Sequence, residues 1–128
     1  MDPRDVQSIP LFAGLSRDDQ KVVAQYADEV DVDAGKVLAQ EGRLAYEFFA
    51  IREGTAEVTL EGSHAASLGP GDFFGEIGLV ETERRTASVV ATTPMDVIVM
   101  YRNEFEQMKK ELPTVADQIQ AAIRTRLG

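Results

Sequence analysis

Between Glu29 and Tyr101 the chain alternates short apolar segments with turns that contain glycine. In several of these segments apolar and polar residues alternate, which is typical of β-strands that bury one face. Many short strands with regular turns between them predict an antiparallel barrel or sandwich. The expected strands span residues 30–32, 36–40, 47–52, 55–60, 65–68, 73–74, 87–91 and 95–100.

A helical segment precedes this β-rich region. Ser16 is predicted to begin a helix, and Asp19, three residues later, gives the pattern of a capping box. Apolar side chains then recur at helical spacing and predict the buried face of this helix, at Leu15, Val22, Val23 and Tyr26.

Two helices are predicted after the last strand. Asn103 is expected to cap a helix from Glu104 to about Glu111, and Pro113 suits the first turn of the next helix. The second helix has an apolar stripe made of Val115, Ile119, Ala122, Ile123 and Leu127. We therefore predict one domain over residues 1–128, with N-terminal helices in 1–28, a β-barrel in 29–101 and C-terminal helices in 103–128.

The segment 74–89, FGEIGLVETERRTASV, interrupts the strand pattern and carries the chemistry. Backbone N–H groups at the start of a helical turn attract anions, and Gly75 allows close approach of a ligand. Arg85 can make a forked, charge-assisted contact to a phosphate. Glu76 would repel a phosphate, so it is better explained as an acceptor for a hydroxyl group. A phosphate and a hydroxyl on one small molecule indicate a nucleotide.

This segment closely resembles the phosphate-binding cassette of cyclic nucleotide-binding domains, as in catabolite activator proteins, protein kinase regulators and gated channels. The resemblance rests on Phe-Gly-Glu at 74–76, Ile-Gly-Leu at 77–79 and Arg-Thr-Ala-Ser-Val at 85–89, with matching spacing. It extends over essentially the whole chain, because the flanking helices and the strand order also fit the family.

The resemblance implies a mainly β fold, an antiparallel jelly-roll-like barrel with an N-terminal helical element, a short phosphate-binding helix and C-terminal helices. It also implies a ligand-sensing regulatory module that binds a cyclic mononucleotide and shifts its C-terminal helices towards an effector protein or second subunit. The expected ligand-binding residues are Gly75, Glu76, Ile77, Gly78, Leu79, Arg85, Thr86, Ala87, Val58 and Ala66.

The choice of base depends on few residues. Thr86 can bond either a phosphate oxygen or the exocyclic amine of guanine. Selective cGMP sites in the family often carry a cation on the preceding strand, where this chain has Ala66, so cAMP is favoured over cGMP. Apolar side chains of the strands could wall the purine or be plain core, namely Val58, Ala65, Ala66, Ile77 and Val89, while Phe73 and Phe74 are expected in the core.

Composition excludes several other classes. Without cysteine and with His64 alone, the chain has no thiolate or histidine metal site, and no residue pattern indicates an enzyme. The net charge of −9 and the lack of a basic stripe argue against nucleic acid. The absence of a long apolar run or a signal sequence indicates no membrane span and a cytoplasmic protein.

Two points stay open at this stage. In the family a lid covers the base, and here it could come from Ile123 or Leu127, come from another chain, or be missing. The alternative function is a protein-interaction module of the same fold with an empty or differently occupied pocket, in which Arg85 and Glu76 would not have these roles.

Overall fold

The computed structural model describes residues 2–10, 12–79 and 83–127. Two short helices come first, α1 (Pro3–Gln7) and α2 (Arg17–Gln25), and two helices end the chain, α3 (Arg102–Glu111) and α4 (Pro113–Leu127). The 3₁₀ helix η1 (Glu76–Leu79) interrupts the strands. The strands are β1 (Asp28–Val32), β2 (Val37–Ala39), β3 (Glu47–Glu53), β4 (Ala56–Leu60), β5 (Ser63–Leu68), β6 (Phe73–Phe74), β7 (Ser88–Ala91) and β8 (Met95–Tyr101).

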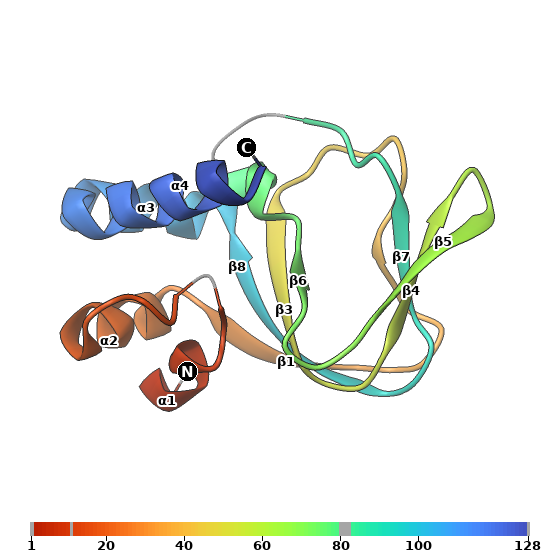
Figure 1. Cartoon of the computed structure of the whole chain (residues 1–128), viewed down its shortest axis with the longest axis horizontal. Helices are drawn as coiled ribbons and strands as arrows, with labels where there is room; N and C mark the ends of the chain where they lie inside the picture. Colours follow the sequence, from red (N-terminus) through yellow and green to blue (C-terminus); the bar gives the residue numbers. More distant parts are fainter. Residues whose placement is uncertain (1, 11, 80–82, 128) are drawn as a thin grey trace.

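The strands form two antiparallel four-stranded sheets that face each other (Figure 1). One sheet has the order β1-β8-β3-β6 and the other has the order β2-β7-β4-β5. The fold is jelly-roll-like and mainly β with flanking helices, as predicted. The sheets do not close into a continuous barrel, because β1 and β6 end one sheet, and β2 and β5 end the other.

The central strands β3 and β8 are apolar on both faces because each face meets a different layer. Phe48 and Ile98 point towards the helices, whereas Phe49 and Val97 point towards the second sheet. Their side chains therefore divide the core into a helical cluster and an intersheet cluster. This burial fixes the register of β3 against β8, since a shift by one residue would exchange the two faces.

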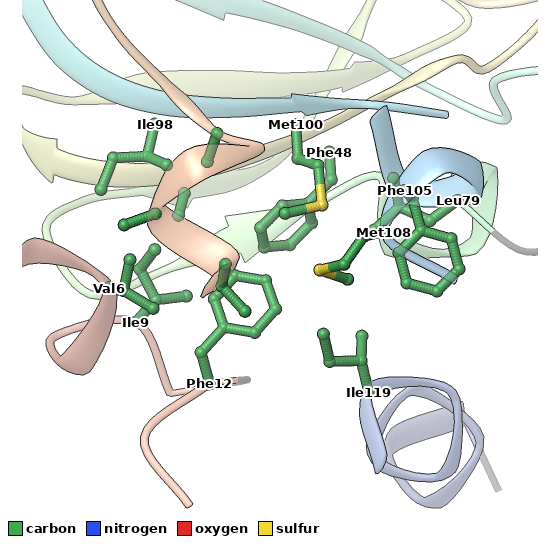
Figure 2. Packing of buried hydrophobic residues seen from close by; sticks show 14 of the residues in the cluster. Val6, Ile9, Phe12, Phe48, Leu79, Ile98, Met100, Phe105, Met108 and Ile119 are labelled. Carbon is green, nitrogen blue, oxygen red and sulfur yellow. The ribbon is translucent and has the colours of Figure 1, made fainter. Parts of the chain in front are cut away.

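The helical cluster joins elements from both ends of the chain. Figure 2 shows Leu79 of η1 beside Phe105 and Met108 of α3, with Ile119 of α4 facing the same cluster. All four side chains are completely buried. The short helix of the cassette is thus part of the same core as the C-terminal helices.

Local structure confirms some expectations and corrects two. Ser16 caps α2 and accepts a hydrogen bond from the backbone N–H of Asp19. The prediction that Asn103 caps α3 is wrong: Tyr101 is the N-cap residue, and Glu104 reaches back to accept from its N–H at 3.0 Å. The strand expected at 65–68 begins earlier, at Ser63, so His64 lies in β5; the turn before it is tight, with positive φ at Glu61 and Gly62.

Candidate functional site

A cavity of about 380 Å³ lies between the cassette (residues 74–89) and the strands β4 and β7. Its cassette wall comprises Gly75, Glu76, Glu83, Arg84, Arg85, Thr86 and Ala87. The remaining lining is apolar and comes from Ala39, Ala45, Val58, Leu68, Phe73, Phe74 and Val89. The cavity lining therefore combines charged groups, two arginines and two glutamates, with apolar side chains suited to a flat apolar group.

Gly75 brings the cassette backbone directly against Arg85. Its φ of +82° lies in the left-handed region, which favours glycine. A Cβ atom here would lie 2.5 Å from Nη1 of Arg85 and 2.5 Å from the carbonyl oxygen of Glu47. No other residue can occupy this position without moving the guanidinium.

The guanidinium of Arg85 is held at the cavity wall by β3. Its Nη2 donates to the carbonyl oxygen of Glu47 at 2.7 Å and lies 3.7 Å from the Glu47 carboxylate. The Arg85 side chain is only 9% exposed. Burial lowers the pKa of Arg85, and the carboxylates of Glu47 and Glu76 only partly oppose this effect.

The short helix η1 continues from Gly75. Glu76 is buried, and the N–H of Gly78 donates to the carbonyl of Gly75 at 3.0 Å, which makes the 3₁₀ turn. Gly78 lies against Ala45, with only 3.1 Å between a hypothetical Cβ and the Ala45 carbonyl oxygen. Small residues on both sides therefore allow η1 to lie close to the segment before β3.

The structure brings together six of the predicted ligand residues around this cavity: Gly75, Glu76, Arg85, Thr86, Ala87 and Val58. Gly78 and Leu79 are buried behind it, Gly78 against Ala45 and Leu79 in the helical cluster. The side chain of Ile77 lies outside the described residues. Ala66 pairs with Val58 but is exposed on β5, away from the cavity lining, because β5 is the edge strand of its sheet.

Sequence reasoning missed several residues that shape the site. Glu47 acts through its backbone carbonyl, which leaves no signal in a side-chain pattern. Ala39 pairs with Val89 across β2 and β7, so a correct strand alignment could have placed it at the cavity. Phe73 and Phe74 were assigned to the core; they contact it and also line the cavity, with Phe74 stacked on Phe49 at a centroid distance of 4.9 Å.

Arg84, next to Arg85, has a different role. It is exposed, and its Nη1 donates to the carbonyl oxygen of Gly42 at 2.8 Å. This bond, and the bridge between Leu44 and Arg84, tie the end of the cassette to the loop before β3. Among the described residues no group of three or more acidic or histidine side chains could hold a metal ion.

The whole chain was compared with known proteins. Residues 29–111 match the family described as the cyclic nucleotide-binding domain. The chain is 29% identical over 123 residues to a cyclic nucleotide-gated potassium channel of Rhizobium etli. The matched region covers 96% of this chain and 34% of the channel. It is 29% identical over 125 residues to the cyclic AMP receptor protein of Thermus thermophilus, covering 92% of this chain and 57% of that protein.

Solved structures give the same result. The N-terminal domain of a transcriptional regulator from Streptomyces coelicolor superposes with a TM-score of 0.85 at 25% identity, covering 96% of this chain and 92% of that domain. The chain spans 34% of the length of the channel and 57% of the length of the cyclic AMP receptor protein, so it corresponds to only part of these relatives. None of the helices in the described ranges is long and apolar enough to cross a membrane.

Proposed function

The chain belongs to the cyclic nucleotide-binding domain family, and we propose that it binds a cyclic mononucleotide, cAMP in preference to cGMP, and shifts its C-terminal helices in response. Domains of this family are regulatory modules that bind a ligand. The proposal places the cyclic phosphate against Arg85 and η1, and the purine against the apolar strands.

The buried guanidinium of Arg85 is the observation that carries this proposal. The Arg85 side chain is 9% exposed, so its guanidinium has lost most of its hydration. The carboxylates of Glu47 and Glu76 offset only part of the resulting cost in free energy. A phosphate entering the cavity would supply the missing charge and accept forked hydrogen bonds. The anion would therefore be stabilised here even though the chain as a whole carries a net charge of −9.

Glu76 is proposed to accept the ribose 2′-hydroxyl. Its buried carboxylate lines the cavity on the same wall as Arg85, and it is close enough to affect the pKa of that residue. A ligand that carries a phosphate and a neighbouring hydroxyl could contact both side chains at once. AMP carries two negative charges on its phosphate and lacks the ring that holds the phosphate beside the ribose, so it should fit less well.

The base is proposed to lie against Val58, Leu68 and Val89, which belong to the apolar lining of the cavity. Thr86 lines the same cavity and is proposed to contact the phosphate or the base. The exposed Ala66 on β5 offers no cation to a guanine. These features support cAMP as the favoured ligand.

Leu79 supports the proposed route from ligand to helices. It lies in η1, directly after the residues that line the cavity, and is fully buried among Phe105, Met108 and Ile119 (Figure 2). Movement of η1 towards a bound phosphate would displace Leu79 and require α3 and α4 to repack. The moved helices would then present a different surface to an effector protein or a second subunit.

Isothermal titration with cAMP, cGMP, 2′-deoxy-cAMP and AMP tests the proposal. We expect cAMP to bind with a dissociation constant around micromolar, about −8 kcal/mol. Since truncation of a desolvated charge contact costs about 2–5 kcal/mol, Arg85→Ala should weaken cAMP binding by at least about tenfold to a hundredfold. The 2′-deoxy compound should bind clearly worse because Glu76 loses its partner.

Arg84→Ala is the matched control: Arg84 also lines the cavity, but it is exposed and its Nη1 already donates to the carbonyl oxygen of Gly42. Its effect on cAMP affinity should be less than about threefold. If the wild-type chain gives no heat and no melting shift with millimolar cAMP or cGMP, the pocket does not bind cyclic nucleotides and the domain is an interaction module of the same fold. If both arginine variants lose affinity equally, the buried guanidinium is not the anchor.

A further inference from the structure

Exposed apolar side chains gather on one face of the molecule. Among the described residues six large apolar side chains are exposed, and one of them, Leu60, lies apart at the end of β4. The other five line three adjoining hollows beside the open edge between β1 and β2; they are Val30, Val37, Leu44, Tyr46 and Tyr101. This clustering is distinct from the scattered apolar residues of an ordinary surface.

The three hollows are neighbours, because each shares at least one lining residue with the next. Val37 and Glu47 line both the hollow near Leu44 and the hollow between β1 and β2. Tyr101 lines the latter and also the hollow of about 660 Å³ along α3. We call this connected surface, from Leu44 through Val37 and Tyr101 to α3, the Tyr101 groove.

The charge of the Tyr101 groove is opposite to that of the chain. The whole sequence has 13 basic and 22 acidic residues, whereas the groove is lined by five basic and two acidic ones. Arg85 lies 3.7 Å from the Glu47 carboxylate, so these two charges offset each other, and Arg85 is assigned to the nucleotide cavity. The basic residues that remain for the rim are Lys36, Arg43, Arg102 and Lys110, against the single acid Glu106.

We propose that the Tyr101 groove docks an acidic peptide segment of a partner protein that carries apolar side chains. The apolar side chains would fill the hollows beside Tyr46 and Tyr101, and the carboxylates would pair with the basic rim. A second copy of this chain is a poorer occupant, because each copy carries a net charge of −9 and the two copies would repel each other. A flat lipid surface fits concave hollows less well than a peptide does.

The groove adjoins the proposed nucleotide cavity at Ala39 and Arg85 and shares no other lining residue with it. The docking proposal therefore does not depend on nucleotide binding, and either proposal can fail alone. The test uses variants that lie in the groove and outside the nucleotide cavity.

Fluorescence anisotropy with labelled synthetic peptides tests the proposal on the whole chain. One peptide alternates Glu with Leu and Phe, a second replaces every Glu by Lys, and a third replaces the apolar residues by Ser. We expect only the first to bind, and its affinity should fall as salt is raised. Val37→Asp and Tyr46→Asp should each weaken binding by at least about tenfold, and Lys110→Glu by about threefold or more.

Matched controls come from the same molecule. Leu60 is 49% exposed and Val37 is 50% exposed, so Leu60→Asp makes the same change outside the groove. Lys109→Glu is the control for Lys110, because Lys109 is exposed on α3 and does not line the groove. Melting curves should show that all variants are folded, and the controls should bind the acidic peptide as the wild type does.

Three results would overturn the proposal. The first is equal binding of the acidic and basic peptides, or no binding of either at millimolar concentration. The second is self-association in sedimentation that Val37→Asp abolishes, which would make a second copy the occupant. The third is co-sedimentation with phosphatidylserine vesicles that Lys110→Glu abolishes, which would make a lipid surface the occupant.

Discussion

Replacement of Gly75 by alanine tests the contact between the cassette backbone and Arg85. The new Cβ would lie 2.5 Å from Nη1 of Arg85 and 2.5 Å from the carbonyl oxygen of Glu47, where ordinary contacts begin at 3.4 Å. The guanidinium and the carbonyl flank this position, and Nη2 of Arg85 donates a hydrogen bond to the Glu47 carbonyl oxygen at 2.7 Å. An added methyl group must therefore separate the guanidinium from the carbonyl or move the cassette.

The size of the effect follows from two contributions. A left-handed backbone costs a non-glycine residue about 1–2 kcal/mol, and loss of a hydrogen bond from a charged group costs about 1.5–3 kcal/mol. We therefore expect Gly75→Ala to lower the free energy of unfolding by about 2.5–5 kcal/mol. Gly71→Ala is the matched control, because Gly71 has a φ of +91° and its added Cβ would meet nothing within 4 Å.

Urea unfolding of both variants separates the contributions. Gly71→Ala should show only the backbone cost, so Gly75→Ala should be less stable by a further ~2 kcal/mol. Titration with cAMP gives a second measurement, in which only Gly75→Ala should lose affinity. Equal destabilisation of the two variants would refute the close contact of Gly75 with Arg85.

Three further predictions concern the core, the charges and the helix contacts. Leu79→Ala should lower the free energy of unfolding by about 2–5 kcal/mol in urea, because the side chain is completely buried, whereas Leu79→Met should cost less than about 1.5 kcal/mol. Burial is the main cause that raises the pKa of Asp96 above 3.8, so its ionisation costs stability as the pH rises through the folded-state pKa. The unfolding free energy of Asp96→Asn should therefore improve relative to wild type as the pH is raised from below 3.8 to neutrality, and parallel pH profiles would contradict this. The hydroxyl of Tyr26 donates to Glu111 and links the end of α2 to α3, so Tyr26→Phe should lower the melting temperature slightly. An unchanged melting temperature would show that the contact is unimportant in solution.

Local patterns in the sequence predicted the strands well but not how the sheets close. The unbroken apolar runs Phe48–Ile51 and Val97–Met100 suit strands that are buried on both faces, as β3 and β8 are. Whether β1 meets β2 and closes a barrel depends on twist and long-range pairing, which no single segment encodes. The cap of α3 shows a similar limit, since Asn103 has the better intrinsic preference but the backbone N–H of Tyr101 is the group that Glu104 reaches.

The grouping of the cassette residues at one cavity follows from their spacing within a short segment. Gly75, Glu76 and Arg85 all lie in this segment and line the same cavity; their role in ligand binding stays a prediction. The carbonyl of Glu47 could not be predicted, because every residue has one and only the folded chain decides which faces Arg85. The Tyr101 groove was missed for a related reason: its apolar residues come from segments far apart in the sequence.

The contact between Arg85 and Glu47 also limits how strongly a ligand could act on the helices. In the proposed mechanism the phosphate competes with the Glu47 carbonyl for the guanidinium, and Leu79 transmits the movement of η1 to α3. A ligand can shift a conformational equilibrium only by its differential affinity for the two states. If the two states differ mainly in the Arg85–Glu47 hydrogen bond, the differential binding free energy is about 1.5–3 kcal/mol. This corresponds to a roughly tenfold to 150-fold difference in ligand affinity between the two states. This is enough to change the population of two states that are close in energy, but too little to convert a state populated at about 1% into one at about 99%.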